Sequence, residues 1–115
     1  MSESKTPNLA GLASQMREDW NRRVAHDYRF WMSDGHKDDQ AMWSAGERDI
    51  EILIQDIPNT HDKTFLELGC GVGRLLRAAQ ARFRHVTGID VADKAIQKAR
   101  ELLGDSPGLT LIVGN

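Results

Sequence analysis

Two acidic residues and a run of glycines are the residues of this chain best suited to chemistry. Three glycines at alternate positions follow Glu67: Gly69, Gly71 and Gly73. Asp90 lies 90 − 67 = 23 residues after Glu67. Glycines lack the Cβ atom that keeps a ligand away from the backbone, and a carboxylate roughly 20 residues beyond such a turn is suited to bind ribose hydroxyls. The spacing therefore predicts a site for a ligand that contains a nucleoside.

The segments around these residues are of the kind needed to bring them together. The apolar run at 65–68 predicts a buried strand. Residues 73–83 predict an amphipathic helix, with Leu75, Leu76, Ala79 and Phe83 on one face. A second strand is expected over 85–89 and ends on Asp90. Because the start of the helix presents unpaired N–H groups, the turn before it favours an anionic group. A strand, a glycine turn, a helix and a strand with an acid at its end can hold a nucleoside cofactor.

The rest of the chain continues the alternation of helices and strands. A helix is expected over 92–103, with Gly104 at its end, and a third strand over 109–113. Such alternation predicts right-handed crossovers and an α/β fold with a parallel sheet. Before the first strand, two helices are expected. The first covers 9–32, with Leu12, Met16, Trp20, Val24, Tyr28 and Trp31 on one face, and the second covers 39–57, with Met42, Trp43, Ile50, Leu53, Ile54 and Ile57 on its apolar face. Residues 1–8 are expected to be a disordered tail.

The glycine spacing argues against a dinucleotide site. The fingerprint of such sites is G-x-G-x-x-G, and its third glycine falls on Arg74 when counted from Gly69 and on Leu76 when counted from Gly71. A nicotinamide-dependent oxidoreductase is therefore disfavoured. The pattern present is Glu67-Leu-Gly-Cys-Gly-Val-Gly73, which resembles motif I of the class I S-adenosylmethionine-dependent methyltransferases. Gly88-Ile89-Asp90 resembles their second motif, and the runs at 19–31 and 43–49 are similar to bacterial type 11 or type 12 members.

This resemblance implies a three-layer Rossmann-like domain, of which the chain would be the first βαβαβ half. The strand order would be 3-2-1, with residues 9–62 as an N-terminal helical cap and residues 63–115 as the cofactor-binding part. The cofactor-binding residues implied are Glu67, Gly69, Cys70, Gly71, Gly73, Ile89, Asp90, Val91 and Asn115.

The resemblance also implies a role for each of these residues. Glu67 would lie near the methionyl amino group of the cofactor, and the glycines would run beneath it. Asp90 would bind the ribose, and Ile89 or Val91 would pack on the adenine. Asn115 would accept a hydrogen bond from the adenine amine. Cys70 is interpreted as a small filler of the turn rather than as a nucleophile.

The helical cap offers further candidate contacts. Tyr28, Trp31 or Trp43 could place an aromatic face against the sulfonium, although core packing is the commoner role of an aromatic stripe. Arg48 could bind the methionyl carboxylate or form a surface ion pair.

Composition excludes several other classes of protein. The chain has 115 residues, a formal charge of −2 and one cysteine. The expectation is one domain in a reducing cytoplasm, without a nucleic-acid surface, a membrane span or a signal peptide. The histidines and the single cysteine lack the spacing of metal ligands, so no metal is expected.

The predicted function is methyl transfer from S-adenosylmethionine to an oxygen, nitrogen or carbon atom of a small molecule, with no catalytic residue assigned. Whether this chain catalyses methyl transfer by itself is left open, because a full domain of this class is longer. The alternative is a non-catalytic half-domain that binds S-adenosylmethionine and forms homodimers through the open edge of the first strand.

Overall fold

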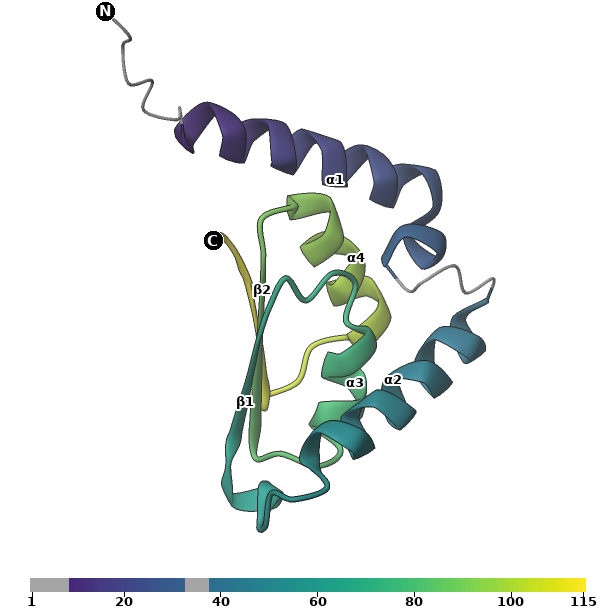
Figure 1. The fold of residues 1–115 in the computed structure, drawn as a ribbon, viewed down its shortest axis with the longest axis vertical. Coiled ribbons are helices and arrows are strands. Elements are labelled where there is room, and N and C mark those ends of the chain that lie inside the picture. The colour runs from purple at the N-terminus through teal and green to yellow at the C-terminus, as the bar shows by residue number, and fades with distance from the viewer. Residues whose placement is uncertain (1–8, 33–37) are drawn as a thin grey trace, which may run out of the picture.

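A computed structural model of the protein describes residues 9–32 and 38–115, with side chains for 10–25 and 38–115 (Figure 1). Residues 1–8, predicted to be a disordered tail, lie outside the described residues. The elements in chain order are α1 (Leu9–Met32), α2 (Asp39–Ile54), a 3₁₀ turn (Thr60–Asp62), β1 (Thr64–Leu68), α3 (Arg74–Gln80), β2 (His85–Asp90), α4 (Asp93–Leu103) and β3 (Leu109–Val113). None of the helices described is long and apolar enough to cross a membrane.

The three strands form one parallel sheet in the order β1-β2-β3, which reads 3-2-1 from the opposite edge. Leu68 pairs with Ile89, and Ile89 pairs with Ile112, so the carboxyl ends of the strands lie together at one edge. Each crossover passes through a helix, α3 between the first two strands and α4 between the second and third. The predicted α/β fold with a parallel sheet is confirmed.

All the helices that pack on the sheet lie on one of its faces. Figure 1 shows α2, α3 and α4 on the same side of the strands and α1 across the end of the sheet. No described element covers the opposite face, where Leu66, Leu68 and Ile112 are 60%, 74% and 43% exposed. The described residues thus supply two of the three layers expected from the sequence.

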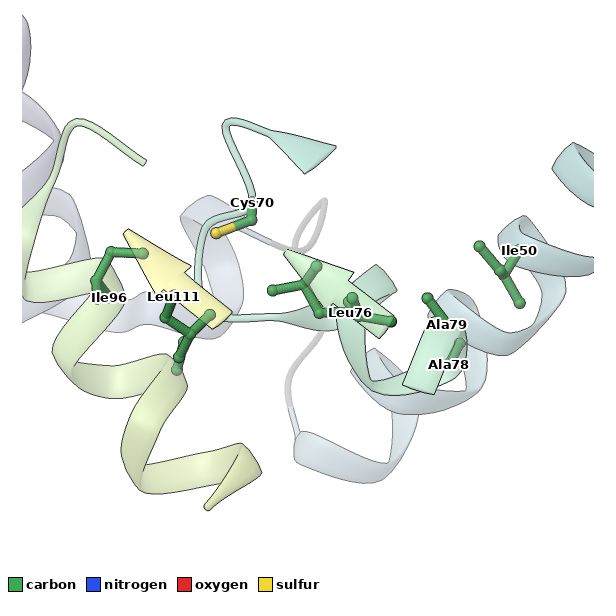
Figure 2. Packing of buried hydrophobic residues seen from close by; sticks show 9 residues of the cluster. Ile50, Cys70, Leu76, Ala78, Ala79, Ile96 and Leu111 are labelled. Atoms are coloured by element: carbon green, nitrogen blue, oxygen red, sulfur yellow. The ribbon is translucent and has the colours of Figure 1, made fainter. Parts of the chain in front are cut away.

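The core lies between the covered face and the helices (Figure 2). Leu76 and Ala79 of α3 and Ile96 of α4 are almost fully buried there, against Val86 of β2. Ile50 brings α2 into the same cluster and is fully buried. Burying a side chain of this size stabilises the fold by roughly 1.5–3 kcal/mol.

Two helices are shorter than the sequence predicted. α2 ends at Ile54 rather than at residue 57, because the residue before Pro58 is disfavoured in the helical conformation. Leu53 and Ile57, expected on the apolar face of this helix, are 58% and 43% exposed. α3 ends at Gln80 rather than at Phe83, whose ring packs on Phe65 with centroids 5.2 Å apart.

Candidate cofactor-binding site

A cavity of about 490 Å³ opens at the carboxyl ends of the three strands. Ligands of open α/β sheets bind at this edge. The cavity is lined by Met16, Trp20, Glu67, Leu68, Gly69, Cys70, Gly71, Arg74, Leu75, Ile89, Asp90, Val91, Gly114 and Asn115. This set contains every predicted cofactor-binding residue except Gly73.

The glycine turn between β1 and α3 forms the floor of the cavity. Gly69 and Gly71 have φ values of +74° and +58°, which side chains disfavour. The amides of Gly69 and Cys70 donate to the Ile89 carbonyl at 2.7 and 3.1 Å, so the turn is fixed to the end of β2. The backbone is therefore held directly under the space where a ligand would lie.

Asp90 joins the glycine turn to the start of α4. Its Oδ2 accepts from the Gly71 amide at 2.8 Å and its Oδ1 from the Ala92 amide at 2.9 Å. The residue is only 7% exposed, yet it also lines the cavity. Because a carboxylate has about four lone-pair sites, it can still accept hydrogen bonds from a ligand hydroxyl. Asp90 thus has a structural role that the sequence did not predict, in addition to the ribose contact proposed for it.

Glu67 leaves a buried carboxylate oxygen at the cavity. Its Oε1 atom is buried and has no hydrogen-bond partner among the described residues. Burial raises the pKa of Glu67 to about 7; the Arg74 charge opposes this rise, and the Asp90 charge adds to it. A cationic group entering the cavity would give the carboxylate the partner that it lacks.

Cys70 lies in the turn as a buried thiol. Burial raises its pKa to about 12, and the nearby charges of Asp90 and Glu67 act in the same direction. The thiol therefore stays protonated, and only a thiolate is a good nucleophile. Its sulfur packs so closely on β2 that a Cβ at Gly88 would lie 2.8 Å from it. This packing favours the role of a filler.

Gly73 faces a helix and not the cavity. Its φ is +100°, and an added Cβ would lie 2.8 Å from the Leu103 Cδ1 of α4. The sequence placed this glycine under a ligand, whereas the structure uses it for the close approach of α4 to the start of α3. Gly69 and Gly71 line the cavity, and contact of Gly73 with the cofactor stays a prediction.

α1 provides the wall opposite the glycine turn, through Met16 and Trp20. The periodicity of α1 placed both residues on its apolar face, but it could not show that this face meets a cavity. Arg74, the first residue of α3, also lines the cavity and was not predicted to do so. Its position directly after the glycine turn was the available signal.

The predicted cap contacts are not brought to the cavity where their side chains are described. Trp43 lies against α3 instead, with the Arg77 guanidinium 4.5 Å from its ring centroid. Arg48 is exposed and is not among the lining residues. Both belong to α2, which packs on α3, whereas the cavity wall comes from α1. The side chains of Tyr28 and Trp31 lie outside the described part of the chain.

In the part of the chain that the structure describes, no group of three or more His, Cys, Asp or Glu side chains is placed to hold a metal ion.

Comparisons with known proteins agree with this geometry. Residues 65–115 match the model of the family described as "Methyltransferase domain". Over 51 residues, 44% of this chain and 22% of the relative, the chain is 37% identical to the ubiquinone biosynthesis O-methyltransferase of Nitrosomonas europaea.

Solved structures show the same fold. The phosphoethanolamine N-methyltransferase 1 of Haemonchus contortus, solved with S-adenosylhomocysteine, has a TM-score of 0.67 and 18% identity over 90% of this chain and 21% of its own. The magnesium protoporphyrin IX methyltransferase of Synechocystis PCC 6803, solved with S-adenosylmethionine, has a TM-score of 0.62 and 20% identity over 99% of this chain and 57% of its own. The chain thus spans about a fifth of the first two of these three relatives. Residues 65–115 match the methyltransferase domain family, and the described residues have the fold of solved methyltransferases that bind S-adenosylmethionine or S-adenosylhomocysteine.

Proposed function

We propose that this chain binds S-adenosylmethionine in the cavity and serves methyl transfer to an oxygen, nitrogen or carbon atom of a small molecule. The observation that carries the proposal is the meeting of Glu67, the glycine turn and Asp90 around one cavity at the carboxyl ends of the strands. In this proposal residues 9–62 form a helical cap and residues 63–115 the first half of the cofactor-binding domain.

The order of the strands suggests how the cofactor would lie. Neighbouring strands are about 4.8 Å apart, so the ends of β1 and β3 are separated by roughly 10 Å. The methionyl part would lie at the β1 end beside Glu67, and the ribose would lie near Asp90. The adenine would lie between Ile89 or Val91 and Asn115, at the β3 end. The cofactor would then run across all three strand ends above the glycine turn.

When bound, S-adenosylmethionine supplies a methyl group that its sulfonium already activates for displacement. The residues of this chain would bind and orient that donor, and placement of two reactants can contribute much of the rate gain. Met16 and Trp20 would exclude water from the side opposite the turn. No general base is proposed from the described residues.

A small-molecule acceptor is supported by the relatives. Two of the solved structures are described as methyltransferases of phosphoethanolamine and of magnesium protoporphyrin IX, and a third as an amino pentose methyltransferase.

Isothermal titration with S-adenosylhomocysteine, beside NAD, tests the binding. We expect saturable binding of S-adenosylhomocysteine and none of NAD. Glu67→Gln is the variant of choice, because it keeps the size of the side chain, and we expect its affinity to fall about tenfold. Asp90→Ala is less informative, since it would also remove the acceptor of two backbone amides. A folded chain that binds NAD, or neither ligand, would overturn the proposal.

The second candidate is a non-catalytic cofactor-binding domain that forms homodimers through β1. It is favoured by one observation: β1 pairs only with β2 among the described strands, and the uncovered face of the sheet next to this edge exposes Leu66 and Leu68. Unpaired edges of this kind readily add a further strand. Light scattering on wild-type protein and on Leu68→Lys tests this second candidate. It predicts a wild-type dimer that the lysine weakens, and a wild-type monomer at high concentration contradicts it.

A further inference from the structure

Two side chains of opposite charge line the cavity at its β1 end. Glu67 lies near the end of β1, and Arg74 is the first residue of α3, directly beyond the glycine turn. The Oε1 atom of Glu67 is buried without a hydrogen-bond partner among the described residues. The side chain of Arg74 is 20% exposed. Burial raises the pKa of Glu67 and the charge of Arg74 opposes that rise, so the two groups are within electrostatic range of each other.

Arg74 is positioned by α2 from outside the cavity. Its Nη1 donates to the Asp49 Oδ2 at 2.5 Å. The backbone beside it is also fixed, because α2 packs so closely that a Cβ at Gly46 would lie 2.3 Å from the Arg74 carbonyl oxygen. A guanidinium carries five N–H donors in a planar fork, and the bond to Asp49 uses Nη1. A second carboxylate, from the cavity side, can therefore be bound by the same group.

The Glu67 carboxylate lacks a partner, and the Arg74 guanidinium can donate to a second carboxylate. Together the two side chains fit a ligand group that carries one positive and one negative charge. An α-amino acid has such a pair, an ammonium and a carboxylate on one carbon atom. We propose that Arg74 binds the carboxylate of the methionyl part of the cofactor, opposite Glu67, and makes the pocket selective for adenosyl ligands with a complete amino acid end. This inference rests on the proposed function. It assigns to Arg74 the contact that the sequence had suggested for Arg48.

Three adenosyl ligands that differ only at this end test the inference by isothermal titration. S-adenosylhomocysteine has both charges, its decarboxylated form keeps the ammonium alone, and 5′-methylthioadenosine has neither. We expect wild-type protein to bind S-adenosylhomocysteine at least tenfold more tightly than the decarboxylated ligand, as for a charge-assisted hydrogen bond. Arg74→Gln should remove this preference and leave the binding of the other two ligands within about twofold. Arg74→Lys, which keeps the charge without the fork, should lie between them.

Arg77→Gln is the matched control. Arg77 lies on the same helix but packs against Trp43, away from the cavity, so its loss should leave the ligand preference unchanged. Equal weakening of all three ligands in Arg74→Gln would show a structural role only and would overturn the inference. Equal affinities of wild-type protein for the three ligands would overturn it without any variant, while leaving the proposed function intact. Absence of binding for all three would overturn both.

Discussion

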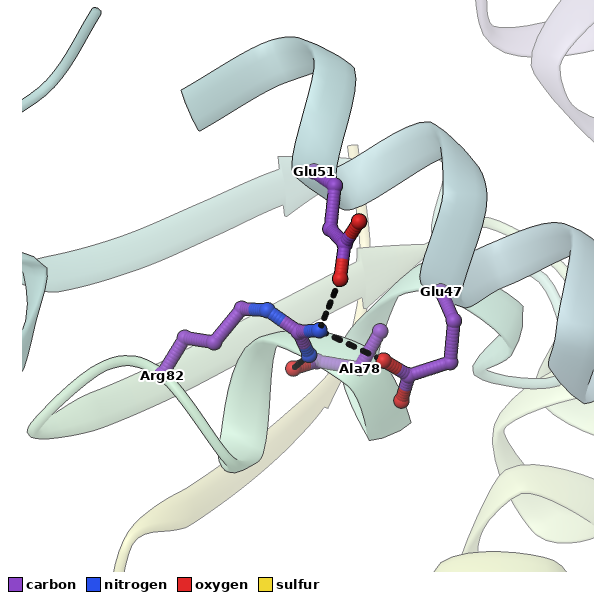
Figure 3. A network of polar contacts seen from close by, with 4 residues as sticks. All are labelled: Glu47, Glu51, Ala78 and Arg82. Atoms are coloured by element: carbon purple, nitrogen blue, oxygen red, sulfur yellow. Dashed lines mark hydrogen bonds and ion pairs between the residues drawn. The ribbon is translucent and has the colours of Figure 1, made fainter. Parts of the chain in front are cut away.

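The two N-terminal helices share a predicted role as a cap, yet they are attached to the rest of the molecule in different ways. α2 is fixed along α3 by buried and charged contacts together. Ile50 is fully buried in the core, Asp49 pairs with Arg74, and Arg82 reaches back to α2. Figure 3 shows the guanidinium of Arg82, which follows α3, between two carboxylates of α2 and the Ala78 carbonyl of α3.

Among its described side chains, at 10–25, α1 is attached at one small region. Val24 packs with Ala92 and Ala95 at the start of α4. Beside them, Asn21 donates from Nδ2 to Asp93 at 2.7 Å and accepts from the Lys94 amide at 3.1 Å. Toward the N-terminus, Leu12 and Met16 are 50% and 48% exposed.

The difference separates two functions within the cap. α2 sets the position of α3 and of Arg74, so one side of the cavity is prearranged before any ligand enters. α1 forms the facing wall of the cavity, and its described contacts are with the first turn of α4. A ligand can therefore change the position of α1 at a smaller cost in free energy than that of α2. The variants below test this contrast, in order of decreasing effect.

Replacing Gly46 with alanine should have the largest effect. The new Cβ would lie 2.3 Å from the Arg74 carbonyl oxygen, which belongs to the backbone and cannot rotate away. We expect a loss of about 3 kcal/mol in the free energy of unfolding, measured by urea denaturation. The sign is informative, because glycine to alanine within a helix otherwise stabilises by about 0.5–1 kcal/mol. Gly108→Ala, whose Cβ would lie 3.4 Å from the nearest atom, is the matched control and should change little. An unchanged free energy of unfolding in Gly46→Ala would contradict the close packing of α2 against the start of α3.

A pH titration of stability tests the cavity side. The pKa of Glu67 is about 7 in the folded chain, against an ordinary value of 4.5, with burial as the main cause and the charges of Arg74 and Asp90 acting in opposite directions. The folded state then holds a proton that the unfolded state has lost, so stability falls as pH rises from about 4.5 to 7 and stays level above. After allowance for partial exposure, we expect a loss of about 2 kcal/mol from this group.

Glu67→Gln isolates this contribution. The amide carries no charge at any of these pH values, so urea denaturation at pH 5 and pH 8 should show a smaller difference in the variant than in wild-type protein. An equal pH dependence in both proteins would show that the carboxyl is not the group responsible.

The sequence predicted the positions of the helices and strands better than it predicted which surfaces their side chains contact. The strands and the bounds of α1 and β3 follow from apolar runs and turn residues, which are local signals. Periodicity also put Met16 and Trp20 on one face of α1, but which surface that face meets depends on the tertiary arrangement. The same limit explains Trp43, for which the sequence left a cavity contact and core packing open, and whose ring packs on Arg77.

The site was predictable where chemistry is fixed by spacing and was missed where it depends on packing. Glu67, the first two glycines of the turn and Asp90 meet at the cavity as expected. The packing of Gly73 on Leu103 was not predicted, because a glycine that admits a ligand and a glycine that admits a side chain look the same in sequence. Arg74 was missed because no pattern shows that α2 holds its side chain in place.

Replacing Asn21 with alanine should loosen α1 with a moderate effect. The variant removes both polar contacts with the start of α4, including the acceptor of the Lys94 amide. Loss of a side chain that accepts from an amide at the start of a helix lowers the free energy of unfolding by about 1 kcal/mol. Hydrogen exchange should show faster exchange of α1 amides with little change in α2. Arg22→Ala is the control, because Arg22 pairs with Asp19 within α1 and does not join α1 to α4. Equally faster amide exchange in both helices would show that α1 and α2 are not attached independently.

Replacing Glu47 with glutamine should have the smallest effect, because it removes one of two carboxylates around Arg82. Glu47 Oε2 lies 2.6 Å from the guanidinium and Glu51 Oε1 lies 3.2 Å from it, and these carboxylate side chains are 47% and 69% exposed. Exposed pairs contribute about 0.2–1 kcal/mol, so a loss of about 0.5 kcal/mol that disappears at high salt is expected. Combining this change with Glu51→Gln in a double-mutant cycle measures how far the two carboxylates substitute for each other. A loss as large as that of Gly46→Ala would mean that charge, and not close packing, holds α2 on α3.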